Sequence, residues 1–294
     1  MKNTVFTGAA TALITPFKNG CIDYEAFSGI LDAQIAGGIS ALVVSGTTGE
    51  GSTLTDAEHR ELIRFAVEKV AGRVPVIAGT GSNDTAYAID LSRYACKVGA
   101  DALLLVTPYY NKATQEGLYQ SFKLIADSVD KPCILYNVPS RTGCNILPAT
   151  AARLAEVENI VAIKEASGDI SQIAELARVC GDKLDIYSGN DNQIVPIMSL
   201  GGKGVISVLS NILPARTNEI CTRFFEGDVK GALDMQLHYL PLIDALFSEV
   251  NPIPAKAAMA AMGLCENSLR LPLTEMSEAK AAKLYDLMRN EGLI

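Results

Sequence analysis

The sequence predicts a (β/α)8 TIM barrel followed by a short C-terminal extension that is entirely helical. Short apolar runs rich in strand-forming residues recur along the chain, and segments with helical spacing separate them. Eight strand–helix repeats, each of about thirty residues, are typical of a parallel sheet closed into a barrel. After residue 225 the runs of strand type stop. We therefore expect a barrel over residues 1–225 and a helical domain over residues 226–294.

The expected strands are short apolar segments that contain β-branched residues, a pattern that favours buried strands. They cover residues 9–14, 41–44, 74–78, 102–106, 134–136, 160–163, 184–187 and 205–208. The whole chain has 294 residues, of which 49% are hydrophobic, so it can bury a large core.

Helices are expected between the strands where a capping residue precedes an apolar repeat of helical spacing. Asp56 opens one such segment, Asp84 opens another, and a third follows Asp169. In the extension, turns rich in proline separate the segments with helical spacing. These segments cover residues 229–248, 254–264 and 275–291.

An open, doubly wound parallel sheet is the rival architecture, and it usually carries a glycine-rich phosphate loop after a strand. Here Gly79-Thr80-Gly81 is followed by Asp84 where the third glycine belongs. The Walker A pattern is also missing from the sequence. The barrel is therefore favoured, and a nucleotide-binding barrel is disfavoured.

The composition excludes several classes of function. The net charge is −8 and the lysines and arginines are scattered, which disfavours a nucleic-acid partner. The sequence has only two histidines, His59 and His238, and no HExxH motif, so we expect no metal site. A Ser-His-Asp triad is equally disfavoured, because His59 lies in a charged stretch and His238 in an amphipathic one.

The seven cysteines form no CxxC pair, and several lie in apolar stretches, as expected of reduced thiols in a cytosolic protein. The first residues lack the pattern of a signal peptide. No uninterrupted apolar run reaches the roughly 18 residues that a membrane-spanning helix needs. We therefore expect a cytoplasmic protein without a membrane segment.

Polar residues gather where the expected strands end. In a TIM barrel the active site lies at this end, where strands pass into the following loops. The polar stretches there are Ser45-Gly46-Thr47-Thr48-Gly49-Glu50, Thr107-Pro108-Tyr109-Tyr110-Asn111, Tyr136 through Gly143, Lys164, Ser188-Gly189-Asn190 and Ser207.

Lys164 is the most unusual of these residues, because it directly follows the apolar run 160–163. Lysine is rarely buried without a reason, and burial favours its neutral amine. A free amine at a strand end is what Schiff-base formation with a carbonyl substrate needs. The simpler alternative is a lysine whose stem leaves the strand end and whose ammonium reaches water.

The other residues also have simple alternatives. Residues 45–49 could form only a tight turn, or their hydroxyls and amides could bind a carboxylate. Tyr109, Tyr110 and Tyr136 could serve only packing, although a phenol near a lysine amine suits acid–base catalysis. Arg141 could be a solvated charge, or its planar fork could bind a carboxylate at two points.

Several of these stretches resemble motifs of a known family. They are Gly46-Thr47-Thr48-Gly49-Glu50, Thr107-Pro108-Tyr109-Tyr110-Asn111-Lys112, Tyr136 through Gly143, Ile163-Lys164-Glu165-Ala166-Ser167-Gly168, Gly204 through Val208, Asn251-Pro252-Ile253-Pro254 and Leu269-Arg270-Leu271-Pro272. They are similar to signatures of the pyruvate-dependent class I aldolases of the dihydrodipicolinate synthase / N-acetylneuraminate lyase family. The resemblance covers essentially the whole chain.

The resemblance implies a mechanism in which Lys164 forms an imine with pyruvate, and the resulting enamine attacks an aldehyde. It implies that Tyr136, Thr47 and Tyr110 relay protons, with Tyr110 reaching in from a neighbouring subunit. Apart from the covalent imine on Lys164, it implies neither an organic cofactor nor a metal.

The resemblance also implies substrate contacts. Thr48 and the backbone of Ile206 would hold the pyruvate carboxylate, with Gly189 beside the same pocket. Arg141 would hold a second carboxylate, which favours aspartate semialdehyde as the acceptor substrate and a role in lysine biosynthesis.

Sugar-acid aldolases, such as N-acetylneuraminate lyase or a 2-keto-3-deoxygluconate aldolase, are the alternative within the same chemistry. A catalytically idle barrel that binds a small molecule is an alternative from another class. The resemblance further implies a homotetramer built as a dimer of dimers.

Feedback control is where the chain departs from the best-known members of the family. Lysine-inhibited members carry an acidic residue where this chain has Tyr87, and a histidine where it has Asp56, although His59 and Asn83 remain. Loss of the acidic partner removes a charge-assisted hydrogen bond, typically about 1.5–3 kcal/mol. We therefore expect inhibition by lysine to be weak or absent.

Overall fold

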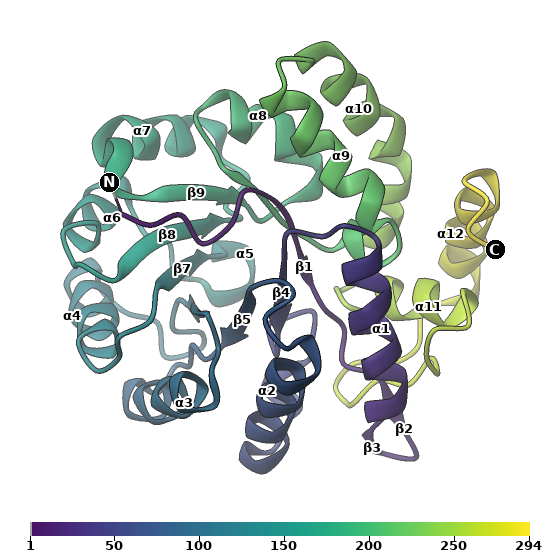
Figure 1. The fold of residues 1–294 in the computed structure, drawn as a ribbon, viewed down its shortest axis with the longest axis horizontal. Coiled ribbons are helices and arrows are strands. Elements are labelled where there is room, and N and C mark those ends of the chain that lie inside the picture. The colour runs from purple at the N-terminus through teal and green to yellow at the C-terminus, as the bar shows by residue number, and fades with distance from the viewer. Residues whose placement is uncertain (1) are drawn as a thin grey trace.

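The structure is a computed structural model that describes residues 2–294. Eight parallel strands close into a barrel in the order β1-β10-β9-β8-β7-β6-β5-β4 (Figure 1). They are β1 (Gly8–Ala12), β4 (Ala41–Val44), β5 (Val76–Gly79), β6 (Ala102–Val106), β7 (Cys133–Asn137), β8 (Ile160–Glu165), β9 (Asp185–Ser188) and β10 (Gly204–Ser207). The predicted fold class is therefore confirmed.

A ring of helices covers the outside of the barrel, as Figure 1 shows. The ring contains α1 (Tyr24–Ala36), α2 (Asp56–Val70), α3 (Thr85–Val98), α4 (Gln115–Ala126), α6 (Pro148–Leu154), α7 (Ile170–Cys180), α8 (Ile194–Ser199) and α9 (Pro214–Phe225). The short elements are β2 (Phe17–Lys18), β3 (Cys21–Ile22), α5 (Pro139–Thr142), η1 (Gly51–Thr53), η2 (Gly181–Lys183), η3 (Asp191–Gln193) and η4 (Leu209–Asn211).

Side-chain caps define the helix starts that the sequence indicated. Asp84 accepts from the first turn of α3, and Asp169 does the same for α7. At α2 the cap is Thr55, one residue before the expected start, and it forms a capping box with Glu58. Such caps satisfy N–H groups that have no partner within the helix.

Strand β8 is longer than the apolar run that predicted it. It continues through Lys164 and Glu165, because Lys164 lies in register between Tyr136 of β7 and Tyr187 of β9. Side chains alternate across a strand. Lys164 therefore has the same orientation as Ala162, which belongs to the apolar cluster inside the barrel.

Three helices follow α9, namely α10 (Val229–Leu246), α11 (Ile253–Ala261) and α12 (Glu278–Asn290). Each begins and ends within a few residues of its expected bounds. In Figure 1, α11 and α12 lie to one side of the barrel. The division of the chain into domains at residue 225 stays a prediction.

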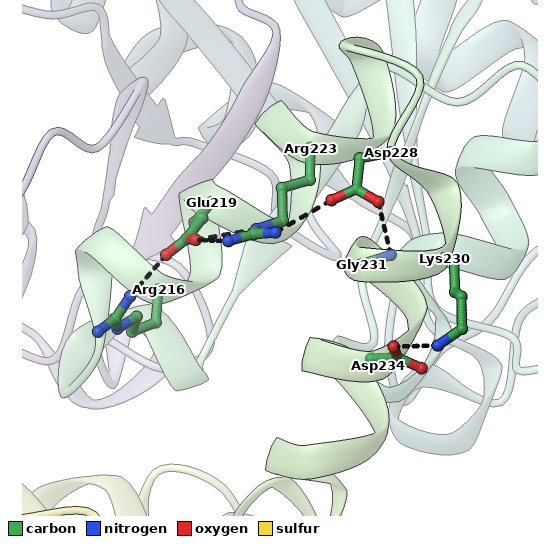
Figure 2. Close-up of polar contacts among 7 residues, drawn as sticks. All are labelled: Arg216, Glu219, Arg223, Asp228, Lys230, Gly231 and Asp234. Carbon is green, nitrogen blue, oxygen red and sulfur yellow. Dashed lines mark hydrogen bonds and ion pairs between the residues drawn. The ribbon is translucent and has the colours of Figure 1, made fainter.

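Charged side chains join α9 to α10, as Figure 2 shows. Glu219 pairs with Arg216 at 2.8 Å and with Arg223 at 2.7 Å. Arg223 also pairs with Asp228 at 3.0 Å, and Asp228 accepts the Gly231 N–H at 2.9 Å as the cap of α10. Exposed pairs of this kind each stabilise a protein by at most about 1 kcal/mol. The pairs between α9 and α10 therefore contribute little to the free energy of unfolding.

No helix within residues 2–294 has both the length and the apolar character needed to cross a membrane.

Candidate active site

A cavity of about 620 Å³ lies at the mouth of the barrel, where the strands end. Thr47, Tyr136 and Arg141 all line it, together with Tyr109. These residues follow or end β4, β7 and β6. The structure therefore brings three of the eight predicted site residues to the lining of one cavity at the strand ends. The lining does not include the other five, Lys164, Thr48, Gly189, Ile206 and Tyr110.

Lys164 lies inside the barrel and not at its surface, since its exposed fraction is 5%. The ammonium nitrogen is 4.3 Å from the centre of the Tyr136 ring. Among residues 2–294, no carboxylate pairs with this nitrogen within 4 Å. The alternative of a lysine that extends into water is therefore wrong, and the amine is next to the phenol that was expected to assist it.

Gly189 leaves room for Lys164. A Cβ atom at residue 189 would lie 2.7 Å from Cβ of Ala166 and 3.2 Å from Cε of Lys164. The first distance is shorter than carbon atoms tolerate, so any side chain there would displace its neighbours. The glycine after β9 therefore allows the lysine chain to extend along the barrel axis.

The turn after β4, residues 45–50, is held by its own backbone and by a distant segment. The Gly49 and Gly51 N–H groups both donate to the carbonyl of Gly46. Thr48 is buried, and its hydroxyl accepts a 2.9 Å hydrogen bond from the Asn251 side chain. The turn is thus a rigid structure, and Thr47 faces the cavity.

Asn251 also contacts Arg141. Nη2 of Arg141 donates to the Asn251 carbonyl at 3.1 Å. The Oδ1 atom of Asn251 is buried without a hydrogen-bond partner among the described residues. Sequence reasoning placed residue 251 only in a turn and in a family motif. Its position next to two predicted substrate contacts could not be found from local sequence, because it lies 203 residues from Thr48.

Asp191 is a second buried polar residue that sequence reasoning missed, although it directly follows Asn190. Its Oδ2 accepts N–H groups of Val208 and Leu209 at 3.0 and 2.9 Å, just after β10. Burial raises the pKa of this carboxyl, while hydrogen bonds and the charge of Lys164 act in the opposite direction. Asp191 thereby supports the strand end that follows Ile206, whose side chain is buried in the barrel.

Glu165, the neighbour of Lys164, faces away from the barrel axis. It accepts hydrogen bonds from the Ser167 N–H at 2.7 Å and from the Asn137 amide at 3.0 Å. Burial raises the pKa of its carboxyl, which these hydrogen bonds oppose. Glu165 thus links the ends of β7 and β8 and does not face the amine.

Tyr110 does not reach the cavity of its own chain. Its exposed fraction is 92%, and its φ of 67° is in the left-handed region. Such a conformation costs a non-glycine residue about 1–2 kcal/mol. The neighbouring Asn111 holds the loop by donating to the Asn83 carbonyl at 2.9 Å. An outward tyrosine on a held loop agrees with the expectation that it acts in another subunit, which stays a prediction.

Metal coordination finds no support in the described part of the chain. Within residues 2–294, no group of three or more histidine, cysteine or acidic side chains is placed to hold an ion. His59 instead shares a 2.8 Å hydrogen bond with the Gly79 carbonyl, and burial lowers its pKa.

Comparison with known proteins gives a consistent result. The model of the Dihydrodipicolinate synthetase family matches residues 5–291. The 4-hydroxy-tetrahydrodipicolinate synthase of Lachnoclostridium phytofermentans is 61% identical over 292 residues, which cover 99% of both chains. The enzyme of the same name from Acetivibrio thermocellus is 52% identical and covers 100% of both.

Solved structures agree with this result. The dihydrodipicolinate synthase of Aquifex aeolicus superposes with a TM-score of 0.96 at 46% identity, covering 98% of this chain and 99% of that one. The enzyme from Acinetobacter baumannii, solved in complex with pyruvate, has a TM-score of 0.96 at 43% identity and covers 99% and 100%. On sequence and fold alike, the chain belongs to the dihydrodipicolinate synthetase family.

Proposed function

We propose that this protein condenses pyruvate with L-aspartate 4-semialdehyde to form 4-hydroxy-tetrahydrodipicolinate, a cytoplasmic step of lysine biosynthesis through diaminopimelate. The observation that carries the proposal is the buried amine of Lys164 beside the ring of Tyr136, which lines a cavity together with Arg141. The names of full-length relatives at 52% and 61% identity support the same reaction.

In the proposed mechanism the Lys164 amine attacks the keto carbon of pyruvate, and loss of water leaves an imine. Removal of a methyl proton converts the imine to an enamine, whose carbon attacks the aldehyde of the semialdehyde. The amino group of the new chain then attacks the imine carbon. The ring closes, and Lys164 leaves as the free amine. The imine withdraws electrons from the methyl carbon, so this reaction requires no metal and no organic cofactor.

Hydroxyl groups move the protons in this proposal, because Nε2 of His59 is hydrogen-bonded to the Gly79 carbonyl. Tyr136 and Thr47 line the cavity, and Tyr110 of a second subunit completes the relay. A proton relay of this kind typically accelerates a reaction by about 10²–10⁴-fold. The requirement for Tyr110 makes a dimer the smallest active form, and we propose a homotetramer built from two such dimers.

Carboxylate recognition decides the substrate. Thr48 and the backbone of Ile206 hold the carboxylate of pyruvate, and the wall at Gly189 leaves room for the imine. Arg141 is exposed and lines the cavity, so its guanidinium can bind the carboxylate of the semialdehyde. The aldehyde-derived part of a sugar acid carries hydroxyl groups and no second carboxylate, so it offers no anionic partner for Arg141. Rates with the semialdehyde should therefore exceed those with N-acetylneuraminate and 2-keto-3-deoxygluconate.

Borohydride reduction in the presence of pyruvate tests the proposal. A reduced adduct of pyruvate is expected on Lys164 alone, as found by mass mapping of peptides. Incubation with borohydride but without pyruvate is the control. If no adduct forms, or if it forms on another lysine, the mechanism is wrong.

Tyr110→Phe should lower kcat by about 10²-fold or more while each subunit still folds, because the side chain is 92% exposed in its own subunit. Tyr119→Phe on α4 is a matched control, since this ring packs against Arg153 away from the cavity. It should leave kcat unchanged.

Mixing two inactive variants tests whether Tyr110 acts across subunits. In a hybrid dimer of Tyr110→Phe and Lys164→Met chains, one site combines an intact Lys164 with an intact Tyr110 from the partner. Activity should therefore return on mixing. If hybrids form but remain inactive, Tyr110 does not act in the neighbouring site.

Inhibition by lysine should be weak or absent, with half-maximal inhibition at or above millimolar lysine. Tyr87 lines the cavity where an acidic partner would be needed. The nearby Asp56 cannot replace it, because Arg60 binds both of its oxygens at 2.9 Å and lowers its pKa. Tyr87→Glu should strengthen inhibition. Half-maximal inhibition of the unaltered enzyme at micromolar to sub-millimolar lysine would refute the prediction.

A further inference from the structure

A buried ion pair connects the C-terminal extension to the turn at residues 45–50. Lys256 of α11 donates to Glu50, the last residue of that turn, and the exposed fractions of the two side chains are 0% and 1%. Nζ of Lys256 also donates to the Ser268 carbonyl at 2.7 Å and lies 4.0 Å from the centre of the Phe17 ring. Both charged groups of the pair are thus removed from solvent.

The second oxygen of Glu50 is also bound by the extension. The Arg270 backbone N–H donates to Oε2 at 3.0 Å. Both oxygens of the carboxylate therefore have a donor between residues 256 and 270. Glu50 itself has a left-handed backbone, with φ 52° and ψ 33°, and its N–H donates to the Thr47 carbonyl at 3.1 Å. The backbone of Glu50 is thereby joined to that of Thr47.

A third contact reaches the same turn from the extension, namely the hydrogen bond from Asn251 to Thr48. The extension therefore contacts two neighbouring positions of the turn. Stability alone does not explain the charged pair, because well-packed apolar residues of similar volume often stabilise a protein as well as a buried ion pair. An ion pair with directed hydrogen bonds does, however, fix a geometry that an apolar contact leaves free.

We propose that Glu50 and Lys256 are positioning residues, which hold the turn so that Thr48 meets the pyruvate carboxylate and Thr47 keeps its place in the proton relay. The inference rests on the proposed function, since it assumes these roles of the two threonines. The C-terminal helices then belong to the machinery of the active site, although they contribute neither the nucleophile nor the proton relay.

The test is the double variant Glu50→Gln/Lys256→Met, which removes both charges and leaves no carboxylate unpaired. Without the Lys256 ammonium, the glutamine can accept only from the Arg270 N–H, so the directed hydrogen bond from α11 to the turn is lost. We expect KM for pyruvate to rise about tenfold or more, with a smaller change in KM for the semialdehyde. The pyruvate concentration needed for half-maximal borohydride trapping on Lys164 should rise by the same factor.

Glu58→Gln is the matched control. It weakens an ion pair between the same extension and α2, in which the Arg270 guanidinium binds Glu58, and removes no donor to Glu50, which is bound by the Arg270 backbone N–H. Its melting temperature should fall, while KM for pyruvate stays within about twofold of the unaltered enzyme. If the double variant also changes the melting temperature but leaves KM for pyruvate within about twofold, the pair has only a structural role and the inference is overturned.

Glu50→Asp provides a second test if the double variant does not fold. The charge is kept, but the carboxylate is drawn back by one methylene, so the turn should shift and KM for pyruvate should rise. An unchanged KM in this variant also overturns the inference. Borohydride trapping with the unaltered enzyme separates the two proposals. If no adduct forms on Lys164, the proposed function is wrong. If the adduct forms but KM for pyruvate is unchanged in the variants, only the positioning role is wrong.

Discussion

Lys164→Met is expected to lower kcat for the condensation by at least about 10³-fold, because it removes the proposed nucleophile, on which every later step of the proposed mechanism depends. Methionine nearly fills the space of the lysine stem inside the barrel, where the side chain is 5% exposed. The fold should therefore persist, and loss of activity will report on chemistry. Steady-state rates with both substrates, together with circular dichroism, measure the two effects.

A surface lysine serves as the control for this variant. Lys183→Met removes a charge whose side chain is 62% exposed and pairs only with Glu156, so kcat should not change. A Lys164→Met enzyme that keeps more than about 1% of the activity would show that the amine is not the nucleophile. Another lysine would then have to be found by borohydride trapping.

Lys256→Met alone should destabilise the protein by about 3–5 kcal/mol, the largest expected effect on folding, because it leaves the Glu50 carboxylate buried without its counter-charge. Burial lowers the pKa of this lysine, and the adjacent Glu50 carboxylate opposes that shift. The free energy of unfolding is measured with urea at one protein concentration, since assembly adds to apparent stability.

The double variant Glu50→Gln/Lys256→Met completes a thermodynamic cycle. It should recover most of the lost free energy of unfolding, since no unpaired charge remains in the interior. A single variant as stable as the unaltered protein, or a double variant no more stable than the single one, would contradict this account. The double variant thus distinguishes an effect on stability from an effect on KM for pyruvate, because it should fold well and still bind pyruvate poorly.

Much of the fold was predictable because its signals are local. Each barrel strand is a short apolar run, and capping residues such as Asp84 and Asp169 mark where helices begin. The residues at which elements begin and end could be predicted less closely. Strand β8 continues through Lys164 and Glu165 because its neighbours pair with them, and no property of these two residues alone predicts a strand.

The candidate site was predictable to the same extent. Once the strands are parallel, residues at their ends must meet, so Thr47, Tyr136 and Arg141 at one cavity follow from sequence order. Tyr110 needed a further argument, since its own subunit leaves it 92% exposed. Only the resemblance to a family suggested that it acts elsewhere.

The sequence by itself determined the barrel, the candidate lysine at the end of β8 and the family to which the chain belongs, because these depend on periodicity and on residues next to one another in the chain. The tertiary structure alone revealed Asn251 against Thr48 and Arg141, the buried Asp191 at the end of β10, and Lys256 against Glu50. Such contacts join segments up to 206 residues apart. They depend on how the closed barrel brings the extension to its mouth, which no local pattern encodes.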